Sequence, residues 1–264
     1  KGINVSRILH ELCMETTALG FLGGFTGKFI FDWLEKDKVK SDFIPINDDT
    51  RINIKIKSDE ETEINGRGPE IIESEAKKLK EQISLLTPED TVVFSGSKRP
   101  SLPDHFYKEL LEIVSRKNIP FVIDTTGQDL MDALPYHPLL VKPNKEELSE
   151  LFQATLKSKK DVIPYGKKLL ELGAQHVIVS MAGEGALLFT KDGVYEGVNP
   201  KGRVKNSVGA GDSMIAGFTG EFKKSQDPIK AFRMGIACGS ATAFSDDLAK
   251  KEAILELIPK IEIN

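Results

Sequence analysis

The sequence has little of what marks several common classes of protein. It contains two cysteines, Cys13 and Cys238, at no spacing typical of a metal site or a disulfide framework, and their apolar neighbours predict that both are buried. Its four histidines lack the spacing of a catalytic triad or a metal site. No apolar run is long enough to cross a bilayer and no signal-peptide pattern occurs, so we expect a cytoplasmic protein without a membrane partner.

Positive charge is not in excess either. The formal net charge is -4 and the sequence pI is about 5.7, which argues against nucleic acid as the main partner. An anionic substrate would therefore have to meet locally clustered cations. With 264 residues, of which 40% are hydrophobic and 29% charged, the chain suits one large globular domain with a substantial core.

Two well-known phosphate-binding loops are also missing. A dinucleotide-binding G-x-G-x-x-G pattern that starts at Gly209 meets Met214 where the third glycine belongs. A Walker A loop ending at 27–28 would need glycine in place of Leu22 and Ser or Thr in place of Phe29. These absences disfavour a nicotinamide-dependent oxidoreductase and a P-loop enzyme.

The most distinctive segment that is present runs from 206 to 213, where two glycines flank Ala210 and Asp212 follows. Apolar residues then recur at helical spacing, namely Met214, Ile215, Phe218 and Phe222. The glycines would lie at a helix N-terminus, whose unpaired N–H groups attract phosphates. Asp212 would repel that phosphate, which favours a base that takes a proton from an attacking hydroxyl. The alternative is a tight turn with Asp212 as the helix cap.

Strand-like and helical patterns alternate along the chain. Apolar strand-like runs lie at 91–95, 121–124, 139–142 and 176–180, and helical patterns lie at 104–117, 145–153 and 159–173. This alternation predicts an α/β fold with a mainly parallel sheet covered on both faces, and ligands in such folds bind at the carboxyl ends of the strands. Two further runs around 191–193 predict a hairpin, so we expect the sheet to end in antiparallel strands.

Residues 51–65 interrupt the alternation with an amphipathic hairpin. Isoleucine alternates with polar residues from 51 to 57, a polar turn follows at 58–61, and a second strand-like run covers 62–65. A hairpin is marginally stable by itself, so its isoleucine face should cover the core, a ligand or another subunit. We interpret it as a lid, and the alternative is an edge hairpin of the main sheet.

Three further segments have both a structural and a functional interpretation. Asn144 and Glu147 have the spacing of a helix capping box, and the same pair could hold hydrated Mg²⁺ beside phosphates. The small residues at 180–186 could admit a base or ribose to the backbone, or could form a tight turn. The small residues at 235–241 predict a helix with one face free of large side chains. Such a face allows close approach of either a neighbouring helix or an adenine ring.

Taken in chain order, these motifs resemble the ribokinase-like carbohydrate kinases of the phosphofructokinase B type. The matching segments are 2–5, 50–53, 95–97, 142–147, 179–180 and 208–213. With Lys1 in front and 206–208 included, the sequence looks most like the 1-phosphofructokinases, with the tagatose-6-phosphate kinases as close relatives. The resemblance implies a three-layer α/β/α fold with a small β lid, in which 1–49 and 67–264 form the core and 50–66 the lid.

The same resemblance implies ATP-dependent, Mg²⁺-assisted phosphorylation of a phosphosugar, foremost D-fructose 1-phosphate to D-fructose 1,6-bisphosphate. Asp212 matches the family's catalytic base, and its anion hole is matched by Gly209, Ala210 and Gly211. The Mg²⁺-associated pair, acting through water, is matched by Asn144 and Glu147. The nucleotide side is matched by Ser180, Gly183, Gly185, Ala237, Gly239 and Ser240. The phosphosugar side is matched by Lys1, Gly2, Asn4, Arg51 and Ser97, and the lid implies a homodimer contact.

The sequence departs from the family pattern at three places. Family members usually have a strand, a sugar-binding aspartate and a first lid segment before the glycine-rich loop, so we expect such residues upstream of Lys1. Lys98 and Arg99 replace a usual Leu-Pro near the sugar site, and Ala182 replaces a common glycine. These departures leave a second hypothesis, a non-catalytic sensor of nucleotide or phosphosugar on the same fold.

Overall fold

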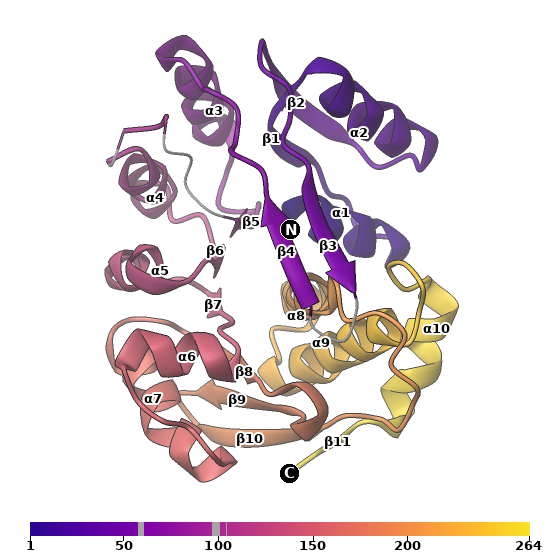
Figure 1. Cartoon of the computed structure of the whole chain (residues 1–264). Coiled ribbons are helices and arrows are strands. Elements are labelled where there is room, and N and C mark those ends of the chain that lie inside the picture. The colour runs from indigo at the N-terminus through magenta and orange to yellow at the C-terminus, as the bar shows by residue number, and fades with distance from the viewer. Residues whose placement is uncertain (58–60, 97–100, 104) are drawn as a thin grey trace. The chain divides into compact units, whose positions relative to one another are not determined.

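The computed structural model describes residues 1–57, 61–96, 101–103 and 105–264, which belong to two compact units. The larger unit comprises Lys1–Glu15, Thr87–Gly96 and Val114–Asn264, and the smaller unit comprises Thr16–Leu86 and Ser97–Ile113. Figure 1 shows the elements coloured in chain order. No helix in the described residues is long and apolar enough to span a bilayer. The predicted division into a core and a lid at 50–66 stays a prediction.

The larger unit is built around a sheet whose strand order in the described residues is β11-β10-β9-β8-β7-β6-β5. The strands are β5 (Val92–Ser95), β6 (Phe121–Asp124), β7 (Leu140–Val141), β8 (Val177–Ser180), β9 (Ala186–Thr190), β10 (Gly193–Val198) and β11 (Glu262–Ile263). β5 to β8 run parallel, and the pairs from β8 to β11 are antiparallel. The predicted parallel sheet with an antiparallel end is confirmed. All residues of β6 are buried, as expected for a strand covered on both faces.

Helices cover both faces of this sheet. They are α1 (Gly2–Glu11), α5 (Gly127–Ala133), α6 (Lys145–Phe152), α7 (Lys159–Glu171), α8 (Ala210–Ser225), α9 (Pro228–Ala243) and α10 (Lys251–Leu257). Figure 1 shows α5, α6 and α7 on one side of the strands and α8, α9 and α10 on the other, which is the expected three-layer arrangement. Short 3-10 turns lie at Leu134–Tyr136, Ala182–Glu184 and Ile258–Lys260.

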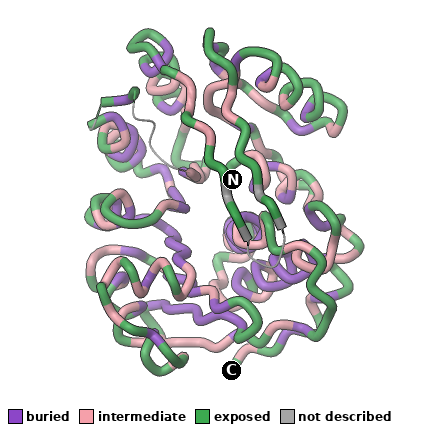
Figure 2. Tube along the Cα trace, viewed as in Figure 1, coloured by how far each residue is buried: buried purple, intermediate pink, exposed green. Residues whose placement is uncertain are grey.

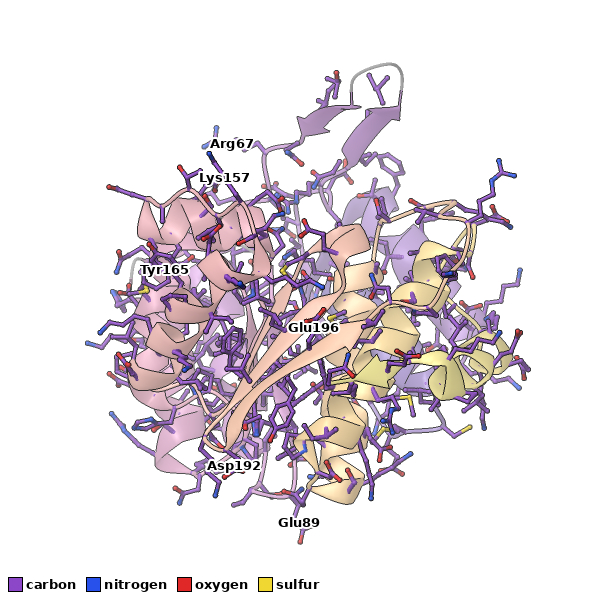
Figure 3. All side chains as sticks on the ribbon, turned by 90° about the horizontal axis from the view of Figure 1, so that it is seen from below. Arg67, Glu89, Lys157, Tyr165, Asp192 and Glu196 are labelled. Atoms are coloured by element: carbon purple, nitrogen blue, oxygen red, sulfur yellow. The ribbon has the colours of Figure 1, made fainter. Side chains whose placement is uncertain are left out.

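The core of the larger unit lies between the sheet and the pair α8 and α9. Both helices are almost continuously buried along their middle turns, as the purple segments of Figure 2 show. Small residues let them approach closely, because a Cβ atom on Gly217 would lie 2.7 Å from the Cys238 sulfur. On the opposite face, Phe152 of α6 and Tyr165 of α7 pack with ring centroids 5.0 Å apart, and Figure 3 labels Tyr165 there.

Among its described residues, the smaller unit contains two separate strand pairs. β1 (Ala18–Gly23) and β2 (Ser41–Ile46) are parallel, and α2 (Gly24–Lys36) connects them. α3 (Glu73–Leu85) belongs to this unit, and α4 (Phe106–Arg116) starts in it. The predicted hairpin forms from β3 (Asn53–Lys57) and β4 (Glu61–Asn65), with Ile54 opposite Ile64. These two side chains share one face and are 49% and 53% exposed, so that face is open to a partner.

The prediction for the cysteines is half wrong. Cys238 is buried in α9, where desolvation raises the pKa of its thiol to about 12. Cys13 is exposed instead. It follows the end of α1 and adopts a left-handed backbone conformation, with φ of 56°, so the chain turns away from the helix before its side chain can join the buried face.

Candidate active site

The glycine-rich segment enters α8 as predicted. Gly209 is the N-cap residue, with φ of +83°, and Ala210 and Gly211 open the helix. A Cβ atom on Gly209 would lie 2.7 Å from Cδ2 of Leu248, so both its conformation and its close neighbour require glycine. Gly209 has no side chain to cap the helix, and the Ala210 N–H donates to the Ser207 carbonyl at 3.2 Å. The next N–H group, at Gly211, is therefore the one best placed to bind an anion.

Asp212 lies in the first turn of α8 and is buried, with 8% of its surface exposed. The Asn4 side-chain amide donates a hydrogen bond to Asp212 Oδ2 at 2.8 Å. The main-chain nitrogen of Lys1 lies 3.8 Å from the same oxygen. The structure thus brings the start of α1, predicted to face the sugar, against the predicted catalytic base.

A buried cation that the sequence analysis did not assign completes this end of α8. Lys142 follows β7 and is 9% exposed. Its Nζ lies 3.1 Å from the point that a Cβ atom on Gly211 would occupy. A buried ammonium and a helix N-terminus both favour an anion at one place. The sequence signal that could have identified Lys142 is its position directly after an apolar strand, where ligands of α/β folds bind.

Lys1 and Gly2 meet the carboxyl ends of two other strands. Lys1 Nζ forms an ion pair with Asp124 Oδ2 at 3.2 Å, and Asp124, the last residue of β6, is buried. Ser95, at the end of β5, pairs with Asp124 in the sheet. A Cβ atom on Gly2 would lie 3.8 Å from the Cβ atom of Ser95. These contacts place Lys1 and Gly2 at the strand ends where ligands of α/β folds bind.

Asn144 and Glu147 form a complete capping box at the start of α6. Asn144 Oδ1 accepts from the Glu147 main-chain N–H at 2.7 Å, and the Asn144 N–H donates to Glu147 Oε2 at 2.8 Å. A β-bridge joins Asn144 to Ser180 at the end of β8. The structural interpretation of this pair is therefore confirmed, and its role toward Mg²⁺ stays a prediction.

The turn after β8 is braced from two sides. Lys145 Nζ pairs with Glu184 Oε1 at 2.6 Å, and this contact raises the pKa of Lys145 and lowers that of Glu184. The Asn199 amide donates to the Ala182 carbonyl at 2.7 Å. A Cβ atom on Gly183 would meet nothing within 4 Å, so its backbone is open to a ligand.

Glycine and alanine at the other predicted nucleotide positions have packing roles. Gly185 has φ of +92°, and a Cβ atom there would lie 2.3 Å from the Gly197 carbonyl oxygen. Ala237 is 0% exposed and Ser240 is 8% exposed, both in α9. A Cβ atom on Gly239 would lie 3.1 Å from the Ala210 carbonyl oxygen, so the bare face of α9 receives α8. Contact of these residues with a nucleotide stays a prediction.

The remaining predicted substrate residues belong to the other part of the chain. Arg51 lies in the smaller unit, two residues before β3, and is half-buried. A Cβ atom on Gly66 would lie 3.6 Å from the Cβ of Arg51, so the two ends of the hairpin meet there. Ser97 lies outside the described residues, as do Lys98 and Arg99.

Comparison with known proteins identifies the class to which this site belongs. A model of the pfkB family of carbohydrate kinases matches residues 1–252, and the chain belongs to that family. Over 263 residues, the chain is 46% identical to the 1-phosphofructokinase of Bacillus subtilis (strain 168), covering 100% of this chain and 87% of that protein. It is 36% identical over 264 residues to the D-tagatose-1-phosphate kinase of Bacillus licheniformis, with coverage of 100% and 87%.

The solved structures agree with this assignment. Phosphofructokinase-2 from Escherichia coli in complex with fructose-6-phosphate superposes with a TM-score of 0.88 at 28% identity, over 98% of this chain and 86% of that one. The resemblance to ribokinase-like kinases inferred from the motifs is thereby confirmed.

Proposed function

We propose that the protein transfers the γ-phosphoryl group of ATP to D-fructose 1-phosphate and forms D-fructose 1,6-bisphosphate. The observation that carries the proposal is the buried carboxylate of Asp212 in the first turn of α8, beside a helix N-terminus entered through glycine. The 46% identical 1-phosphofructokinase of Bacillus subtilis supports the choice of reaction and sugar.

Asp212 is assigned the role of general base. Its Oδ2 accepts a hydrogen bond from Asn4, so Oδ1 would take the proton of the sugar 6-hydroxyl. The hydroxyl oxygen of the sugar would then attack the γ-phosphorus of ATP. General-base help of this kind contributes typically about 10²–10⁴-fold to a rate. The hydrogen bond from Asn4 fixes the carboxylate, so no reorganisation is needed when the proton moves.

The N-terminus of α8 is assigned to the migrating phosphoryl group. In the loop formed by Gly209, Ala210 and Gly211, the N–H groups of the two glycines, together with the Lys142 ammonium, would stabilise charge on the phosphoryl oxygens. Phosphoryl transfer depends mostly on positioning and electrostatics, so a buried cation beside a helix N-terminus suits it.

ATP and Mg²⁺ are assigned to the ends of β7 and β8. Asn144 Oδ1 and Glu147 Oε2 are held in the capping box, so this pair fits Mg²⁺ through water rather than as a direct cage. Within the described residues, no group of three or more His, Cys, Asp or Glu could hold a metal ion directly. When bound, Mg²⁺ would neutralise phosphate charge. The open backbone of Gly183 and the end of β8 at Ser180 would face the nucleotide, and Gly185, Ala237, Gly239 and Ser240 would shape the wall behind it through their packing.

The phosphosugar is assigned to Lys1, Gly2, Asn4, Arg51 and Ser97. The hairpin formed by β3 and β4 is assigned the role of a lid that closes over the sugar and limits hydrolysis of ATP. The exposed isoleucine face around Ile54 and Ile64 suits a second copy of the hairpin, and supports a homodimer through the lid.

D-tagatose 1-phosphate is the second candidate substrate, because the chain is 36% identical to the D-tagatose-1-phosphate kinase of Bacillus licheniformis. Tagatose 6-phosphate and fructose 6-phosphate complete the set of candidate acceptors. A non-catalytic sensor on the same fold would bind ATP and phosphosugar without turnover.

The test is a coupled ADP-release assay on the full-length protein with each of these sugar phosphates and MgATP. We expect the largest kcat/KM with D-fructose 1-phosphate, and at most about one hundredth of that turnover from an Asp212→Asn preparation run in parallel. A larger kcat/KM with D-tagatose 1-phosphate would move the assignment to that sugar. Binding of ATP and sugar without ADP release would establish the sensor instead.

A further inference from the structure

An ion pair ties α1 to the loop that follows α9. Arg7 and Asp247 meet in a two-point contact, with Nη1 to Oδ1 at 3.2 Å and Nη2 to Oδ2 at 2.6 Å. The Arg7 side chain is 11% exposed, whereas that of Asp247 is 61% exposed. A paired guanidinium and carboxylate fix orientation as well as distance, because two parallel hydrogen bonds define one geometry.

The residues next to Asp247 support the entrance to α8. Leu248 is buried, and its Cδ2 lies 2.7 Å from the point that a Cβ atom on Gly209 would occupy. The Ala249 N–H donates to Thr242 Oγ1 at 3.2 Å, and Thr242 Oγ1 is hydrogen-bonded to Ser213 Oγ at 2.8 Å. The loop therefore contacts the first turn of α8 at Gly209 and, through Thr242, at Ser213.

The other end of the contact is α1, whose Asn4 side chain is hydrogen-bonded to the Asp212 carboxylate. Asn4 and Arg7 are one turn apart on α1 and lie on the same side of the helix. Asn4 donates to the Asp212 carboxylate, and Arg7 holds the loop that packs against Gly209. One helix thus contacts the carboxylate and, through Asp247 and the neighbouring Leu248, the anion hole at Gly209.

We propose that Arg7 and Asp247 are a positioning pair, which sets the distance between the Asp212 carboxylate and the anion hole at Gly209. The proposal rests on the function proposed above and adds two residues to it that touch neither substrate. Breaking the pair would let the loop and Gly209 shift relative to Asn4 and Asp212. A displacement of about 1 Å remote from the reacting atoms can cost up to about 10²-fold in rate.

The experiment is a double-mutant cycle in the full-length protein with Arg7→Gln, Asp247→Asn and the two combined. We expect kcat to fall roughly tenfold in each single variant while both KM values change less than about twofold, since ground-state binding is not touched. The loss in the double variant should be clearly smaller than the sum of the two single losses, because the two residues share this contact. Asp247→Glu should recover part of kcat.

Glu11→Gln is the matched control. Glu11 also ties α1 to the segment after α9, because its Oε1 lies 2.6 Å from Lys250 Nζ. Lys250 follows Leu248 in the chain, so this ion pair does not join α1 to the residues directly before Leu248. We expect this variant to keep kcat while losing about as much thermal stability as Asp247→Asn. Equal kcat losses in both variants, additive losses in the cycle, or an unchanged kcat in Asp247→Asn would each overturn the positioning role. Absence of ADP release by the unmodified protein with every sugar would overturn the proposed function and this role together.

Discussion

The helices α2 and α8 both have glycine as the N-cap residue, but the charged groups beside their N-termini differ. α2 begins after Gly23 and α8 begins after Gly209. At α2 the Asp49 carboxylate accepts from the Phe25 N–H at 3.1 Å, and a Cβ atom on Gly24 would lie 1.4 Å from the same Oδ1. A carboxylate of the smaller unit therefore occupies the space where an anion would bind to α2.

α8 has its carboxylate beside the entrance rather than over it. Asp212 is held by Asn4, and the ammonium of Lys142 lies next to Gly211. The amide end of α8 thus faces a cation, whereas that of α2 faces an anion from its own unit. Glycine before a helix opens a place for an anion, and the neighbouring charges decide whether a ligand or the protein itself fills it.

The largest expected effect comes from removing the carboxylate at α8. Asp212→Asn keeps the shape of the side chain but cannot accept the hydroxyl proton, so kcat should fall about 10²–10⁴-fold. Asp49→Asn at α2 is the matched change and should leave kcat unaltered. Steady-state ADP release measures both, and near-full turnover by Asp212→Asn would remove Asp212 from the role of base.

The next effect comes from removing the cation at α8. Lys142→Met should lower kcat/KM for ATP roughly 10- to 100-fold, because a hydrogen bond to a charged group contributes about 1.5–3 kcal/mol. Lys28→Met is the control at α2, where Lys28 pairs with Asp32 at 2.7 Å on the helix surface. Should the two variants have the same kcat/KM, Lys142 would have no part in phosphate binding.

The smallest effect comes from opening the entrance to α2. Asp49→Ala removes a capping carboxylate, which should reduce the free energy of unfolding by roughly 1 kcal/mol and leave kcat unchanged. Thermal unfolding and ADP release, measured on one preparation, separate the two quantities. A loss of kcat at full stability would mean that the α2 entrance also serves the reaction, and the contrast with α8 would fail.

The sequence predicted the fold well because its signals are local and repeated. Continuous apolar runs predicted β5, β6 and β8 close to their observed bounds, and helical spacing predicted α6 and α7. Cys13 was misassigned, because a left-handed residue after a helix changes the direction of the chain without changing its apolar neighbours.

The candidate site was predictable only in part. Gly209 and Asp212 form one short motif, so their joint position at a helix N-terminus could be inferred. Lys142 could not be assigned from its own neighbours, because its role depends on Gly211, which is far along the chain and next to it only in the folded structure.

The sequence by itself determined which residues are able to do chemistry: an acid after a glycine loop, a capping pair after a strand, and glycines where only glycine fits. The tertiary structure decided which of them act together. It set Asn4 against Asp212, Lys142 against Gly211 and Asp124 against Lys1, and it closed α2 with Asp49. The physical reason is that burial and charge pairing depend on contacts between segments that are distant in the sequence, and local sequence patterns do not predict those contacts.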